Sequence, residues 1–158
     1  MAQFGRYFEE FQVGEVYKHW PGRTITESDD VLLCMLTMNH HPLHIDANYA
    51  KDSDYGRQVV VGNLVVDIAM GQSVPDVSGR ALANLGFEKI EFLAPTFHGD
   101  TIYSESEVLE VKESSSRPDR GIVKVETRAL NQRGELVMKF RRAVMIAKLP
   151  PDEPGPPK

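Results

Sequence analysis

The chain has 158 residues, one cysteine and a formal net charge of −5. This length fits one compact domain, because folded domains typically run about 100 to 150 residues. The acidic balance argues against a nucleic-acid-binding protein, which would concentrate Lys and Arg to neutralise phosphates, and it favours a small-molecule partner.

The N-terminal third is predicted to hold a broken strand and then a helix. Strand-forming residues run from Val16 to Ile25 and are interrupted by Pro21-Gly22. Thr26, followed three residues later by Asp29, forms a capping-box pattern that predicts a helix start. Its apolar face would comprise Val31, Leu32, Met35 and Leu36, so we expect a helix from about Thr26 to Met38.

Two further helices are expected in the next third. Pro42 disfavours helical geometry at the preceding residue, so the segment 39–43 is predicted to be a non-helical connection. A short helix should follow at about Asp46 to Lys51. A longer one should begin just after Gly62 and end before Pro75, with Leu64, Val65, Ile68 and Ala69 as its buried stripe.

After Gly79 the pattern changes to β-prone runs separated by turns. The segment 131–134 is predicted to be the hairpin turn between strands at about Val123–Leu130 and Glu135–Lys148. Helices followed by hairpin-connected strands predict an α+β domain, in which an antiparallel sheet wraps a central apolar helix. Its unpaired sheet edge favours a homodimer, or a larger homo-oligomer built from dimers.

The domain is expected to span residues 1–149, with a flexible Pro-rich tail over 150–158. The N-terminal residues lack a basic start followed by an apolar run. No stretch approaches the ~20 apolar residues needed to span a bilayer. We therefore predict a cytoplasmic protein without membrane partners, which the lack of any intramolecular disulfide also fits.

Three histidines lie together as His40, His41 and His44. As metal ligands they would be poorly aligned, because adjacent residues point in different directions and Pro42 interrupts a helix, so no metal is expected. A second interpretation is a structural polar turn whose side chains bond the local backbone. The third is general acid-base catalysis, for which histidine is the usual residue. The remaining histidines, His19 and His98, are expected to be structural, with His19 on a strand surface or at an interface.

The segment from Asn39 to Asp46 resembles the hydratase motif of the MaoC-like, (R)-specific enoyl-CoA hydratase family. That motif reads Asp, any residue, Asn, Pro, an aliphatic residue, His, a variable residue and Asp. The matching positions here are Pro42, Leu43, His44, Asp46, Tyr49 and Ala50, and the resemblance continues at Gly62, Phe92-Leu93-Ala94-Pro95, Gly99-Asp100 and 131–135. It covers nearly the whole chain and implies a hot-dog fold.

The resemblance implies that His44 activates the water that adds to an enoyl double bond. It also implies that the backbone N–H of Gly62 binds the thioester oxygen, where negative charge develops at a helix N-terminus. Asn39 stands where the family has its catalytic Asp, and His41 stands where it has Asn. Asn39 can orient a water molecule but cannot accept and return a proton. We expect Asn39 to act with His44 in catalysis and His41 to contact the substrate.

The predicted activity is that of a hydro-lyase, a hydratase or dehydratase acting on a 2-enoyl-CoA or 3-hydroxyacyl-CoA. Coenzyme A would be part of the substrate, and no separate cofactor is expected. The replacement at Asn39 suggests a substrate with its own carboxylate, such as mesaconyl-CoA, which an Asp would repel. Two alternatives stay open: a hot-dog thioesterase using Asp67 on the central helix, and a non-catalytic thioester-binding subunit.

Overall fold

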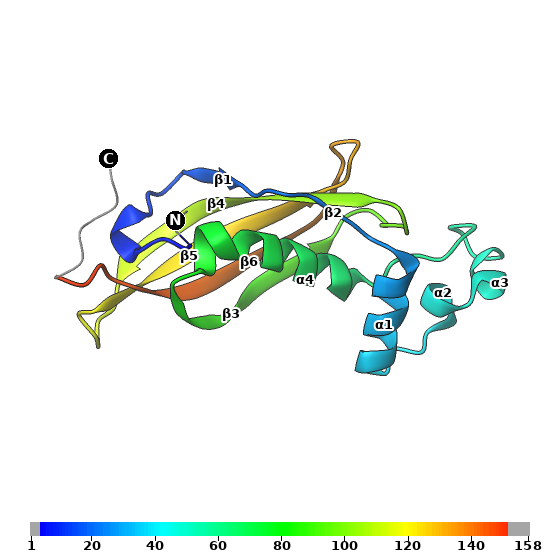
Figure 1. The fold of residues 1–158 in the computed structure, drawn as a ribbon, viewed down its shortest axis with the longest axis horizontal. Coiled ribbons are helices and arrows are strands. Elements are labelled where there is room, and N and C mark those ends of the chain that lie inside the picture. Colours follow the sequence, from blue (N-terminus) through cyan, green and yellow to red (C-terminus); the bar gives the residue numbers. More distant parts are fainter. Residues whose placement is uncertain (1–3, 152–158) are drawn as a thin grey trace.

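The computed structural model describes residues 4–151 as an antiparallel sheet with one long helix along a face (Figure 1). The strand order is β1-β4-β5-β6-β3, and β2 pairs with β4. The strands are β1 (Val16–Lys18), β2 (Arg23–Thr24), β3 (Ala81–Phe92), β4 (Thr101–Glu113), β5 (Arg120–Leu130) and β6 (Leu136–Ala147). The predicted sheet and central helix are confirmed, whereas the predicted tail lies outside the described residues from residue 152 onward.

The helices are α1 (Glu27–Thr37), α2 (Pro42–Ile45), α3 (Ala47–Ala50) and α4 (Gly62–Ser73), together with a short 3₁₀ turn η1 (Phe8–Glu10). The capping box that predicted α1 is present. The N–H of Asp29 donates to Thr26 Oγ1 at 3.3 Å, and the N–H of Thr26 donates to Asp29 Oδ2 at 2.8 Å. These two bonds satisfy N–H groups that the first turn would otherwise leave unpaired.

Of the two predictions that rested on proline, the one for Pro42 needs correction. The predicted non-helical connection over 39–43 is shorter in the structure. It ends at His41, because Pro42 is the first residue of α2. Proline suits the first helical position, where its missing N–H would have no partner. The predicted end of the long helix before Pro75 is confirmed, because α4 ends at Ser73 and Pro75 lies in the π-helical turn that follows, η2 (Val74–Ser78).

Helix α4 packs on the sheet through one side only. Its buried residues Val65, Val66 and Ala69 share a core cluster with sheet residues such as Ile102 and Phe140. On its outward side Asn63 and Asp67 are exposed, so the helix is apolar toward the sheet and carries polar residues on this outward side. The N-terminal end of α4 points toward α1, α2 and α3, which cluster at one end of the sheet (Figure 1).

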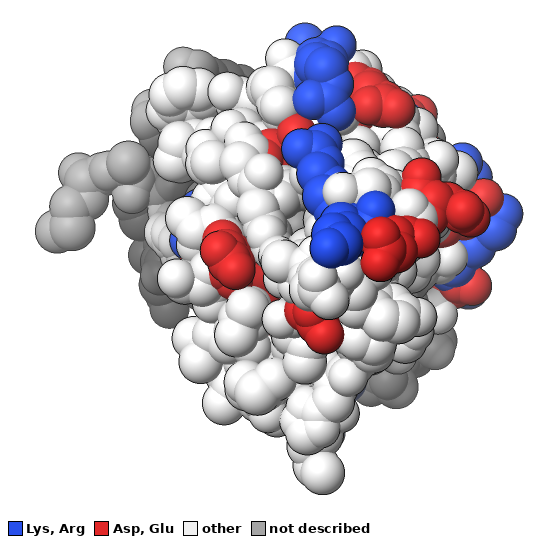
Figure 2. All heavy atoms as spheres, turned by 90° about the vertical axis from the view of Figure 1, so that its right-hand side faces the viewer, with Lys and Arg blue, Asp and Glu red and all other residues white. Residues whose placement is uncertain are grey.

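Two surfaces carry exposed apolar side chains. The first is the edge strand β3, where Leu82, Leu85, Phe87, Ile90 and Phe92 are each at least 40% exposed. The second is α1 and its C-cap, with Leu32, Met35, Leu36 and Met38 exposed. Viewed from the α1–α3 end, charged side chains of both signs mix over the upper part, and the lower part is mostly uncharged (Figure 2). Within residues 4–151, no helix is long and apolar enough to cross a membrane.

Candidate active site

A cavity of about 410 Å³ lies at the N-terminal end of α4. It brings together His44 and Gly62, which are 18 positions apart in the sequence. The remaining wall comes from the segment before α4, the end of β3 with the loop after it, and the start of β6. These lining residues are Tyr55, Val59, Val60, Asn63, Val65, Phe92, Leu93, Ala94, Pro95, Thr96, Val137 and Met138. The cavity is therefore mainly apolar, with few polar groups, as is usual for small-molecule sites.

The ring of His44 is held in one orientation by the backbone. Its Nδ1 lies 2.7 Å from the carbonyl oxygen of Val59, and the side chain of Gln58 donates to the carbonyl oxygen of His44 at 2.9 Å. A carbonyl oxygen only accepts hydrogen bonds, so Nδ1 must carry the hydrogen. In the neutral ring this leaves Nε2 as the acceptor. His44 can therefore take a proton from a water molecule through Nε2.

Gly62 is the first residue of α4. Among residues 4–151 its backbone N–H has no hydrogen-bond acceptor. Such an N–H at a helix N-terminus stabilises negative charge through both the hydrogen bond and the helix dipole. A Cβ at this position would lie 2.6 Å from the ring of Phe92, so only glycine lets that ring close over the start of the helix. The arrangement can bind an oxygen atom on which negative charge develops.

Asn39 and His41 do not line this cavity in the single chain. Asn39 Oδ1 accepts the N–H of His41 at 3.3 Å, and His41 Nδ1 accepts the N–H of Leu43 at 3.1 Å as the N-cap of α2. The rings of His41 and His44 have their centroids 5.8 Å apart. Both residues thus shape the loop that presents His44, and their catalytic and substrate-binding roles stay predictions.

Asp67, the residue of the thioesterase alternative, lies away from His44. It lines a separate groove on the outward side of α4 with Trp20, Gly71 and Gln72. Asp67 does not line the cavity that holds His44 and Gly62. Within residues 4–151, no group of three or more His, Cys, Asp or Glu side chains is placed to hold a metal ion.

The predicted position of His19 on a strand surface or at an interface is wrong, because this side chain is buried within the chain. Its Nδ1 lies 2.8 Å from Asp76 Oδ2, and its Nε2 lies 2.8 Å from Ser106 Oγ. Burial lowers the pKa of His19, an effect that the Asp76 carboxylate partly opposes. The order Asp-His-Ser is that of a nucleophilic triad, but Ser106 is fully buried and also bonds Thr127 at 2.8 Å. No substrate can reach it, so the chain of bonds is structural.

A family model described as mesaconyl-CoA hydratase matches residues 2–155. The chain belongs to the mesaconyl-CoA hydratase family. A protein of Cereibacter sphaeroides named mesaconyl-CoA hydratase is 36% identical over 152 residues, which are 96% of this chain and 44% of that protein. This member of the family therefore spans less than half the length of that relative.

Solved structures confirm the fold of this mesaconyl-CoA hydratase family member. A MaoC domain protein dehydratase from Chloroflexus aurantiacus superposes with a TM-score of 0.88 at 33% identity, over 98% of this chain and 44% of that chain. A Mycobacterium tuberculosis protein described as having a double hot-dog fold gives a TM-score of 0.85 at 26% identity, over 96% of this chain and 47% of that chain. The hot-dog fold and the MaoC-like resemblance are both confirmed.

Proposed function

We propose that the chain is a hydro-lyase that adds water to a 2-enoyl-CoA, or removes it from a 3-hydroxyacyl-CoA. The observation that carries this proposal is that His44 and Gly62 line one cavity. One supplies a ring nitrogen able to move a proton, and the other supplies an N–H at a helix N-terminus. Family membership supports the same reaction class.

The proposed reaction uses these two groups and one water molecule. Nε2 of His44 takes a proton from water while the water oxygen bonds to the β-carbon of the enoyl group. The double-bond electrons move toward the thioester, and the N–H of Gly62 binds the resulting enolate oxygen. His44 then returns the proton to the α-carbon and is neutral again. We propose that no separate cofactor takes part, since coenzyme A enters with the substrate.

A branched or dicarboxylic acyl group such as mesaconyl is the proposed substrate class. The name of the Cereibacter sphaeroides relative supports it. Among the described residues, no Asp or Glu lines the cavity, so a second carboxylate on the acyl group would meet no like charge from them. The lining residues Tyr55, Asn63 and Thr96 carry side chains that can donate hydrogen bonds to such a carboxylate.

The direct test compares mesaconyl-CoA with crotonyl-CoA on the purified chain, following the enoyl absorbance and the free thiol in parallel. We expect the absorbance to fall faster with mesaconyl-CoA and no thiol to appear. Much faster hydration of crotonyl-CoA would overturn the substrate class alone. Thiol release would favour the thioesterase alternative, and binding without turnover would favour the non-catalytic subunit.

We also propose a second hot-dog unit, most simply another copy of this chain, as the partner of β3. This strand pairs with β6 on one side and forms a free edge of the sheet on the other. A long edge with exposed apolar side chains is a template for pairing with another chain. Cytoplasmic location and the absence of nucleic-acid and membrane partners stay predictions.

Replacing Ile90 by lysine is expected to shift the protein from dimer to monomer in sedimentation velocity experiments. Ile90 is 42% exposed on β3 and does not line the cavity. A lysine would place a charge in the proposed apolar contact. The matched control is Val13→Lys, which makes the same kind of change at a 65% exposed residue before the opposite edge strand. A dimer unaffected by Ile90→Lys would exclude β3 as the contact.

A further inference from the structure

Asp30 is a fully buried carboxylate that the proposed reaction does not use. Its Oδ1 accepts the backbone N–H of Val61 at 2.9 Å, and its Oδ2 lies 2.9 Å from Nε2 of His98. A buried carboxylate is costly unless it is paired and hydrogen-bonded, and here both oxygens have partners. The side chain therefore ties three separate parts of the chain together: α1, the residue before α4, and the loop between β3 and β4.

The segment 59–61 connects the two groups of the proposed site. The carbonyl oxygen of Val59 fixes the ring of His44, and the N–H of Val60 donates to the carbonyl oxygen of Thr96 at 2.9 Å. The N–H of Val61 donates to Asp30. Gly62, whose N–H has no acceptor in the part of the chain that the structure describes, comes next. A shift of this segment would change the distance between the proton-transferring ring and the oxygen-binding N–H.

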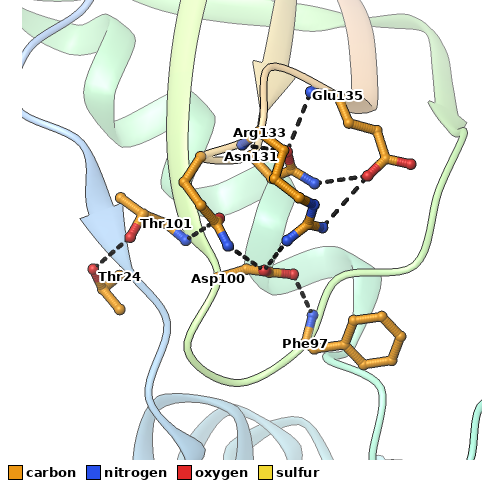
Figure 3. Close-up of polar contacts among 8 residues, drawn as sticks. Thr24, Phe97, Asp100, Thr101, Asn131, Arg133 and Glu135 are labelled. Carbon is orange, nitrogen blue, oxygen red and sulfur yellow. Dashed lines mark hydrogen bonds and ion pairs between the residues drawn. The ribbon is translucent and has the colours of Figure 1, made fainter.

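The loop that carries His98, the partner of Asp30, is itself held in place by hydrogen bonds. In that loop Asp100 Oδ2 accepts the N–H of Phe97 at 3.0 Å (Figure 3). Asp100 Oδ1 accepts from Gln132 at 2.8 Å. It also accepts from Arg133 at 3.2 Å (Figure 3), and both bonds join the loop to the β5–β6 turn. Burial alone would raise the pKa of Asp100, but these hydrogen bonds lower it overall, so the carboxylate stays charged.

The same loop is also bonded to the residue before the α1 cap. The N–H of Gly99 donates to the carbonyl oxygen of Ile25 at 2.8 Å, and the N–H of Ile25 donates to the carbonyl oxygen of Asp100 at 2.9 Å. Gly99 has φ +91°, a backbone conformation that glycine adopts readily. His98 therefore approaches Asp30 from a loop that is fixed at two places.

We propose that Asp30, held by His98, is a positioning residue that fixes Gly62 relative to His44. Asp30 acts through the N–H of Val61 and does not touch the substrate. This inference rests on the proposed function, because it gives the segment 59–62 a role in aligning base and oxyanion donor. It predicts that the contact affects turnover more than binding, since misplacing catalytic groups by about 1 Å can cost about 10²-fold in rate.

The test compares Asp30→Ala with Asp30→Asn. Asparagine keeps an oxygen that accepts from Val61 and gains an amide that can donate to an unprotonated His98 Nε2. We expect Asp30→Ala to lower kcat about 10²-fold with little change in KM. We expect Asp30→Asn to keep most of the wild-type kcat. The matched control is Ser106→Ala, which removes a buried partner of His19 away from the cavity. It should lower Tm and leave kcat near the wild-type value.

A second pair of variants serves if Asp30→Ala does not fold. The side chain of His98 is 20% exposed, so His98→Ala should be tolerated, and His98→Gln keeps a donor for Asp30. Loss of kcat in His98→Ala with recovery in His98→Gln supports the inference. Equal kcat values in the two His98 variants would overturn it. So would a wild-type kcat in a folded Asp30→Ala protein, or equal losses of kcat in Asp30→Ala and Ser106→Ala.

Amide hydrogen exchange separates this inference from the proposed function. The amides of Val60 and Val61 can be followed without substrate, even if the wild-type chain hydrates no thioester tried. Faster exchange at both in Asp30→Ala, but not in Ser106→Ala, supports the positioning role. Unchanged exchange at Val60 would show that the segment does not depend on Asp30. Absence of wild-type turnover would count against the proposed function alone.

Discussion

Replacing His44 by alanine is expected to lower kcat for thioester hydration about 10²- to 10⁴-fold, the usual contribution of a positioned acid-base group. KM should change little, because the other side chains that line the cavity remain in place. His44→Asn should lose as much activity. Its amide nitrogen is attached to Cγ, as Nδ1 is, and can still donate to the carbonyl oxygen of Val59, but the amide cannot carry a proton between water and the α-carbon. Initial rates over a range of substrate concentrations measure both constants.

The control for this experiment lies in the same loop. Asn39→Asp keeps a side-chain oxygen that can accept the N–H of His41, so the loop should fold as before. On a simple enoyl substrate such as crotonyl-CoA, this variant should retain or raise activity, because a carboxylate can also accept a proton. A His44→Ala protein with wild-type turnover would refute the assignment of His44.

Replacing Gly62 by proline is expected to lower kcat about 10²- to 10³-fold below that of Gly62→Ala, which is the usual cost of losing one oxyanion donor. Proline removes the N–H and suits the first position of a helix. The preceding residue, Val61, has φ −60° and ψ 127°, a conformation that a following proline favours. The helix should therefore survive the change.

Alanine is the matched control because it keeps the N–H. Both substitutions place a Cβ against the ring of Phe92, so this steric effect is common to the two proteins. The difference between their kcat values then reports the hydrogen bond. Similar kcat values for Gly62→Pro and Gly62→Ala would show that the N–H of Gly62 does not bind the thioester oxygen.

The local rules of helix capping and strand alternation predicted most of the elements. Thr26 and Asp29 marked the start of α1 because a capping box depends on residues only three positions apart. Pro42 was misread because proline is compatible with the first turn of a helix as well as with its end. Which of the two applies depends on what the neighbouring residues bond to.

The site was predictable where it rests on a motif and unpredictable where it rests on tertiary contacts. His44 and Gly62 stood out from the sequence, and the structure places both at one cavity. The burial of Asp30 depends on His98, which is 68 positions away. Asp30 lies one helical turn before Cys34, and the structure shows that both side chains are buried. An acid on a buried helix face implies a partner, but the sequence does not say which.

The central claim is that this cavity adds water across a double bond instead of cleaving the thioester. The most direct test incubates the wild-type chain with mesaconyl-CoA in water labelled with heavy oxygen and analyses the products by mass spectrometry. The proposed reaction predicts label in a new hydroxyl group on an intact coenzyme A thioester. Label in a free carboxylate, together with an equal amount of released coenzyme A, would contradict it.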